Sequence, residues 1–142
     1  MPTDLPAALA KFTSPHDVEH LRALEAAAAR IDPTKLTEAD FRAVFDLYER
    51  FPDEDGYGIF WTFLHAVEAA DGYESALLAS VDRKPVEFNV MMAGRFLNAG
   101  VVELAERNVL TLLNALAVET DISSRARETA KNFLANKARS EA

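Results

Sequence analysis

The sequence predicts an all-α fold, because apolar residues recur every three or four positions and no stretch alternates apolar and polar residues in the manner of a half-buried strand. Helix-starting residues and glycine or proline stops separate the periodic stretches at short intervals. We therefore expect six or seven short antiparallel helices joined by tight turns. A chain of 142 residues with 49% hydrophobic residues is long enough to bury one core, so residues 1–142 are expected to form a single helical domain.

Capping residues indicate where the first helices begin. Ser14 precedes Pro15, which suits the N-cap and first position of a helix over about residues 15–30. Thr37 with Asp40 three residues later has the pattern of a capping box, so a second helix is expected there. The expected helices of the whole chain start near residues 15, 38, 57, 73, 86, 101 and 122. Pairs of such helices would form an irregular HEAT-like array, because these starts show no fixed period.

Glycine and proline residues indicate where the later helices end. Asp71-Gly72 ends the third helix, Pro85 ends a short fourth helix, and Asn98-Ala99-Gly100 ends the fifth. Within the fifth helix, Ala93-Gly94 would allow a second helix to approach closely. The sixth helix, expected over about residues 101–117, is apolar on most sides and is therefore predicted to be central.

Acidic residues are concentrated in the middle of the chain. The segment from Glu38 to Asp82 holds eleven acids and two bases, a formal charge of −9, while the whole chain carries −8. Acids gathered on one surface repel nucleic acid and attract basic proteins. The basic residues near the C-terminus are interrupted by acids, so we expect no direct nucleic-acid partner.

The composition favours a cytoplasmic protein. There is no cysteine, so neither a disulfide framework nor a thiolate metal site is available, and the chain suits a reducing compartment. Met1 to Phe12 includes an acid and two prolines before any apolar run, unlike a secretory signal peptide. No run approaches the roughly 18 apolar residues that a membrane-spanning helix needs. We therefore expect no membrane partner, and the oligomeric state is left open.

Two histidine patterns raise the alternative of a small metal-dependent enzyme. His16, Glu19 and His20 match the H-x-x-E-H motif, in which two histidines on one helix bind zinc and a glutamate activates water. No third ligand is evident, so a solvated helix face is the simpler interpretation. On the third helix, His65 and Glu68 are a generic metal-binding or acid–base pair, for which a buried, hydrogen-bonded histidine is the simpler interpretation.

The familiar catalytic motifs are missing from the sequence. It contains no glycine-rich phosphate loop, no G-x-S-x-G elbow and no cysteine nucleophile. These patterns accompany the common kinases and hydrolases, which are therefore disfavoured. We expect a protein without enzymatic activity, without catalytic residues, and without a cofactor or metal.

Aromatic residues are interspersed with the acids of the middle segment. Aromatic side chains inside a charged rim are typical of a protein-binding hot spot, provided that the rings are exposed; otherwise the acids simply keep the surface hydrated. In the binding hypothesis the acids speed association with a positively charged protein, and the aromatic side chains slow its release. The predicted partner-binding residues are Asp53, Glu54, Asp55, Tyr57, Trp61, Glu68, Asp71, Tyr73 and Glu74.

Four short stretches support a more specific hypothesis: residues 58–65, which are rich in aromatic side chains, Tyr73-Glu74, residues 80–85 and residues 95–100. From about Phe51 to Gly100, about a third of the chain, the sequence resembles all-helical bacterial immunity proteins, the cognate antitoxins of polymorphic and contact-dependent growth inhibition toxins. The resemblance implies a cytoplasmic toxin inhibitor that acts by protein–protein interaction on the C-terminal domain of one toxin, commonly a nuclease. The alternative is a helical adaptor or scaffold that binds a basic endogenous protein.

Overall fold

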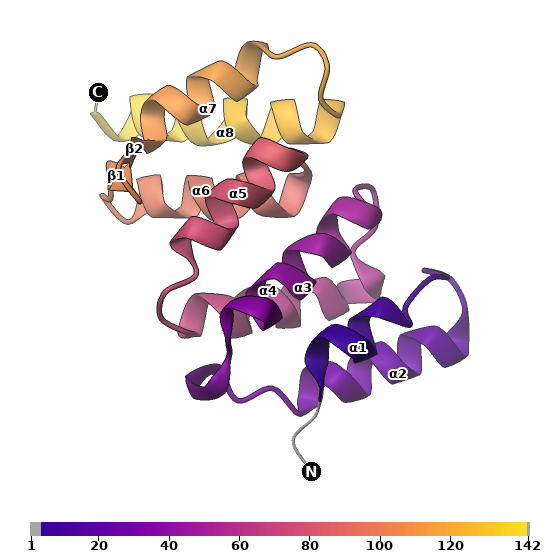
Figure 1. The fold of residues 1–142 in the computed structure, drawn as a ribbon. Coiled ribbons are helices and arrows are strands. Elements are labelled where there is room, and N and C mark those ends of the chain that lie inside the picture. The colour runs from indigo at the N-terminus through magenta and orange to yellow at the C-terminus, as the bar shows by residue number, and fades with distance from the viewer. Residues whose placement is uncertain (1–3, 142) are drawn as a thin grey trace. The chain divides into compact units, whose positions relative to one another are not determined.

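The computed structural model describes residues 4–141, and their regular structure is almost wholly helical (Figure 1). The all-α class is confirmed, although residues 4–141 contain eight α-helices where six or seven were expected. Within these residues, no helix combines the length and apolar character needed to cross a bilayer. The α-helices are α1 (Leu5–Ala10), α2 (Val18–Ala29), α3 (Glu38–Arg50), α4 (Ile59–Ala69), α5 (Glu74–Arg83), α6 (Glu87–Asn98), α7 (Val109–Val118) and α8 (Ser124–Glu141).

The predicted capping box begins α3, but the predicted start of α2 is wrong. The side chain of Thr37 accepts a hydrogen bond from the Asp40 N–H at 3.3 Å, and the Asp40 carboxylate accepts one from the Thr37 N–H at 2.9 Å. In α2 the N-cap is Asp17, whose carboxylate accepts from the His20 N–H at 3.1 Å. The helix therefore begins three residues later than Ser14-Pro15 suggested.

Residues 101–108 do not form the first half of the predicted sixth helix. The short strands β1 (Glu103–Leu104) and β2 (Arg107–Asn108) pair antiparallel instead. Ala105 and Glu106 between them have positive φ values of 47° and 69°, which an α-helix does not allow. α7 begins only at Val109, and its side chains Leu110 and Val118 are exposed, so part of this helix faces solvent although the sequence predicted a central position.

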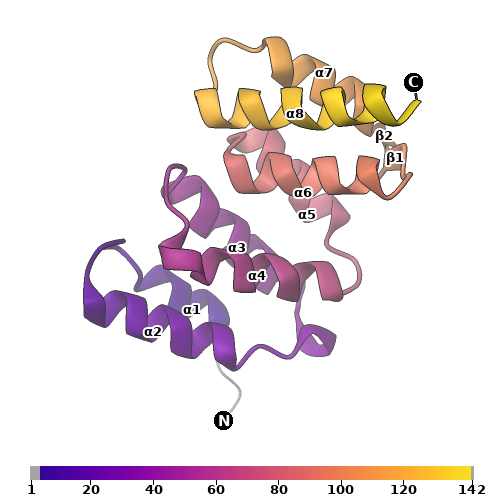
Figure 2. The same ribbon diagram turned by 180° about the vertical axis from the view of Figure 1, so that it is seen from behind.

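Contacts between Cα atoms divide the chain into two compact units, with the boundary between Ala76 and Leu77, inside α5. In the first unit, α1 packs against α2 and α3, and α4 packs against the same two helices. In the second unit, α8 packs along both α6 and α7, as Figure 2 shows. The expectation of one single domain stays a prediction.

Two contacts hold the helices of the second unit together. A Cβ atom at Gly94 of α6 would lie 2.4 Å from the ring of Phe133 in α8, so the absence of a side chain allows this close approach, as the sequence predicted. The buried amide of Asn89 donates to Ser80 Oγ and to the Lys84 carbonyl, both at 2.9 Å, and accepts from the Val86 N–H at 2.8 Å. Asn89 thereby joins α6 to α5 without leaving a buried polar group unpaired.

The core of the first unit fixes the position of α4. Phe60, Phe63, Leu64 and Val67 form an apolar stripe along α4 and are fully buried. Tyr48 of α3 is also buried, and its hydroxyl donates to the Phe60 carbonyl at 2.9 Å. Burial raises the pKa of Tyr48 well above its ordinary value, because the phenolate would be desolvated, and the negative charge of Glu68 adds to this effect.

Replacing Tyr48 with phenylalanine tests this anchor. At neutral pH, Tyr48→Phe should lower the free energy of unfolding by about 1 kcal/mol, because the Phe60 carbonyl loses a buried donor. The folded-state pKa is raised, so the stabilising contribution is complete below the unfolded value of 10.0 and is lost as the pH rises above it. Urea unfolding at pH values from about 7 to 11 measures both effects.

Between about pH 9 and 11, the free energy of unfolding should therefore fall less in Tyr48→Phe than in the natural protein. Tyr57→Phe is the matched control, because it removes the hydroxyl of a tyrosine that is 71% exposed instead of buried. Parallel decline of all three proteins would contradict the assignment of this effect to Tyr48.

Candidate functional site

The outer face of α4, opposite its buried apolar stripe, carries aromatic and polar side chains. Trp61, His65 and Glu68 follow one another at helical spacing, away from the buried side of the helix. Trp61 is 37% exposed, and its ring centroid lies 6.2 Å from that of His65. His65 is exposed, so its interpretation as a buried histidine is wrong.

The turn before α4 places an aromatic side chain among acids. Asp53 and Asp55 are exposed, Glu54 is half-buried, and Tyr57 is 71% exposed. Because Trp61 follows one helical turn after Tyr57, both rings lie at the N-terminal end of α4, beside the three acids. The structure therefore brings together five of the nine predicted residues at this end: Asp53, Glu54, Asp55, Tyr57 and Trp61.

An unusual backbone holds Tyr57 in this turn. In the 3-10 turn η2 (Gly56–Gly58), three successive residues have positive φ values: Gly56 at 59°, Tyr57 at 53° and Gly58 at 93°. The glycines adopt this left-handed conformation readily, whereas Tyr57 does so at a cost in free energy. Asp55 offsets part of that cost, since its Oδ1 accepts a hydrogen bond from the Tyr57 N–H at 3.0 Å.

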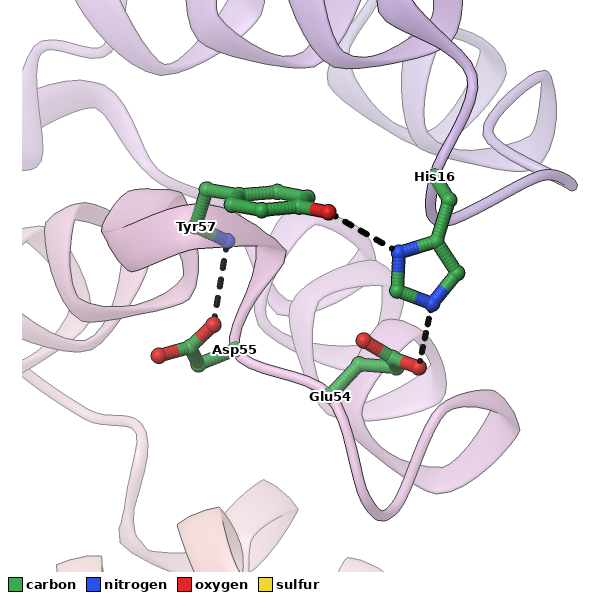
Figure 3. A network of polar contacts seen from close by, with 4 residues as sticks. All are labelled: His16, Glu54, Asp55 and Tyr57. Carbon is green, nitrogen blue, oxygen red and sulfur yellow. Dashed lines mark hydrogen bonds and ion pairs between the residues drawn. The ribbon is translucent and has the colours of Figure 1, made fainter.

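His16 links this turn to the segment before α2. Its Nδ1 lies 3.1 Å from the Tyr57 hydroxyl and its Nε2 lies 3.0 Å from Glu54 Oε1 (Figure 3). Both contacts are satisfied if Nε2–H donates to the carboxylate and Nδ1 accepts from the phenol. His16 therefore belongs to the site. The sequence did not indicate this, because its two partners are 38 and 41 positions away.

The H-x-x-E-H pattern does not have the helical geometry that a zinc peptidase motif requires. Because α2 begins at Val18, His16 lies outside the helix, whereas His20 lies within it. His20 Nδ1 accepts a hydrogen bond from the Thr13 N–H at 3.2 Å. Over residues 4–141, no group of three or more His, Asp or Glu side chains is arranged to hold a metal ion. The motif therefore carries no argument for metal chemistry.

The remaining predicted residues lie toward the other end of α4. The eleven residues of this helix span about 16 Å, so Asp71 and Glu74 lie well apart from the acids of the preceding turn. Tyr73 is only 6% exposed and packs with its ring centroid 6.1 Å from that of Phe41. The prediction of an exposed aromatic anchor at Tyr73 is wrong, because the ring completes the core of the first unit.

Arg50, one of the two bases of the acidic segment, is held by contacts with the end of α1 and with Asp46. Arg50 donates to the carbonyls of Leu9 and Phe12, at 3.0 and 2.8 Å, and pairs with Asp46 at 2.8 Å. These contacts satisfy carbonyl groups at the end of α1, where a positive charge is favourable. The guanidinium of Arg50 is therefore committed to a structural role.

A shallow depression lies between α2 and α4, directly beside Tyr57. Its volume is about 380 Å³, and it is open to solvent. No local pattern in the sequence indicates this depression, because its walls come from segments about thirty positions apart. The lining includes Glu25, Ala28 and Ala29 from α2, and Tyr57, Ile59 and Thr62 from the start of α4 and the turn before it.

No protein-family model, curated protein or solved structure matches this chain. The principal surface feature of the first unit is the acidic–aromatic surface, by which we mean Asp53, Glu54, Asp55, Tyr57 and Trp61 at the N-terminal end of α4.

The contact between His16 and the turn can be tested by hydrogen exchange. His16→Ala removes the side-chain partner of both Glu54 and the Tyr57 hydroxyl, and amide exchange at residues 55–58 should become about three- to tenfold faster. The melting temperature should change by no more than about 2 °C, because the imidazole of His16 is exposed. His65→Ala is the matched control and should leave exchange at the turn unchanged. Equal exchange in all three proteins would show that His16 does not hold the turn.

Proposed function

We propose that this protein is an immunity protein that binds and neutralises a cognate toxin domain, a basic nuclease, in the cytoplasm. The observation that carries the proposal is the exposure of Tyr57 and Trp61, 71% and 37%, beside the acids at the N-terminal end of α4. These acids belong to the segment whose formal charge is −9. Exposed rings in an acidic surrounding are suited to a basic protein partner.

Charge explains why a nuclease is the favoured partner. A nuclease must present positive groups to phosphates, so its substrate groove attracts an acidic protein surface. Asp53, Glu54 and Asp55 would enter this field first and accelerate encounter. The more distant Asp71 and Glu74 would add to the long-range attraction, and Glu68 extends the acidic character along the outer face of α4.

The aromatic side chains would determine how long the complex lasts. Tyr57 and Trp61 are large and partly rigid, so they exclude water from a contact at a small cost in conformational entropy. Loss of such anchors mainly raises the rate of dissociation. Because Tyr73 is buried, its contribution is to the stability of the first unit, and it is not part of the contact surface.

We also propose that the helices form an irregular HEAT-like array. An irregular HEAT-like array would present helix faces and the turns between them to a partner. Support comes from the succession of short helices and from the packing of α1 and α2, and of α3 and α4, in the first unit.

A growth assay separates immunity from the alternative of an adaptor for an endogenous basic protein. The immunity proposal predicts that the gene directly follows a large toxin gene and that this protein rescues cells expressing the terminal domain of that toxin. Tyr57→Ala with Trp61→Ala should weaken rescue, because removing two anchors costs on the order of 2–4 kcal/mol of binding free energy.

The control is Val118→Ala, which removes an apolar side chain that is 77% exposed but lies in the second unit. It should rescue growth as the natural protein does. Failure of the natural protein to rescue cells would contradict immunity and would favour the adaptor.

Charge substitutions test the role of the acids in association. Reversing Asp53, Glu54 and Asp55 to lysine should slow association with the purified toxin domain by about tenfold or more and flatten its salt dependence. The substitutions Asp53→Asn, Glu54→Gln and Asp55→Asn keep the hydrogen-bond acceptors of the turn, and together they should give a smaller change in the same direction. Stopped-flow measurements at several ionic strengths provide the rates.

The matched control reverses three acids of the second unit, Glu103, Glu106 and Asp121, and so changes the net charge equally. The control should slow association far less than the substitutions in the turn. If both triple reversals slow association equally, net charge alone is responsible and the local surface is not the contact.

A further inference from the structure

The depression between α2 and α4 has the chemistry of a pocket for one long side chain. Its volume of about 380 Å³ lies at the small end of the range for ligand sites, roughly 300–1,000 Å³, so it is too small for a helix. Ala28 and Ala29 present only methyl groups on the α2 side, and Ile59 adds apolar surface on the α4 side. These groups suit the methylene stem of an extended side chain.

Charge complementarity defines the end group of that side chain. Among the residues that the structure describes, Glu25 is the only acid that lines the depression, and no basic side chain lines it. No hydrogen bond or ion pair joins the Glu25 carboxylate to another residue of the described range, 4–141. A planar guanidinium can satisfy such a carboxylate through two parallel N–H donors, whereas an ammonium acts only as a point charge.

Tyr57 also lines the depression, and both its backbone N–H and its side-chain hydroxyl make contacts that hold it. Asp55 holds its backbone N–H at 3.0 Å, and His16 contacts its hydroxyl at 3.1 Å (Figure 3). The ring nevertheless remains largely exposed, since Tyr57 is 71% accessible. A fixed, exposed aromatic face attracts a guanidinium, which can stack on it.

We infer that this depression binds a single arginine side chain of the partner protein, with its stem over Ala28 and Ala29, its guanidinium paired with Glu25, and its plane against Tyr57. His16 is then a positioning residue for the ring. The inference rests on the proposed function, because it names the part of a basic partner that this surface recognises.

The pocket can be tested without the toxin, by NMR titration of the ¹⁵N-labelled protein with N-acetyl-arginine amide. Saturable shifts are expected at the amides of residues 25–29 and 57–62, with a dissociation constant in about the millimolar range. N-acetyl-citrulline amide, which has nearly the same shape but no charge, should bind about tenfold more weakly or not at all. Equal binding of the two probes, or no saturable shift with the arginine probe, would overturn the inference.

Variants then assign the binding to the named groups. Glu25→Gln should weaken binding of the arginine probe about three- to fivefold, because an exposed ion pair contributes modestly. Glu19→Gln is the control, since Glu19 is an exposed acid on the same helix that pairs with Arg22 at 3.5 Å, outside the depression. Unchanged binding in Glu25→Gln, or equal weakening in both variants, would contradict the pocket.

The arginine titration and the growth assay distinguish a failure of the pocket from a failure of the immunity proposal. Arginine binding that requires Glu25, in a protein that rescues no toxin-expressing cell, would support the pocket and refute immunity. Rescue of growth without any arginine binding would support immunity and refute the pocket.

Discussion

The left-handed turn before α4 is the constraint on which the candidate site depends. Gly56, Tyr57 and Gly58 all have positive φ. For Tyr57 this conformation costs free energy, because its side chain restricts the backbone in a way that glycine avoids. The Asp55 carboxylate, the His16 imidazole and the tight packing of Gly56 on Phe60 hold the turn in place. The result is a ring that points into solvent next to acids, which an ordinary helix start would not produce.

Local signals predicted much of the helical structure. The capping box before α3 and the apolar stripe of α4 act within a few residues, so they are visible in the sequence. The six residues of α1 are too few to show a period, and this helix was missed. The apolar residues of 101–108 fit a helix and a hairpin equally well, so the sequence does not distinguish the two. The positive φ values of Ala105 and Glu106 show that the chain forms the hairpin.

The candidate site could be predicted only where exposure follows from local spacing. Trp61 lies opposite the buried stripe of its own helix, so its exposure was predictable. The burial of Tyr73 depends on Phe41, and the contact of His16 with Tyr57 joins residues 41 positions apart. Neither is visible without the tertiary packing. The depression beside Tyr57 was missed for the same reason, because Glu25 belongs to another helix.

Fixed aromatic rings and concentrated charge together give a physical basis for recognition of a basic protein, with the charge speeding encounter and the rings slowing release. The most direct measurement is hydrogen–deuterium exchange of the protein with and without the purified terminal domain of the proposed cognate toxin. Protection should be strongest at residues 53–61, extend along α4 to Glu68, and reach residues 25–29 of α2. Protection confined to residues 77–142, or absent throughout, would contradict the proposed surface.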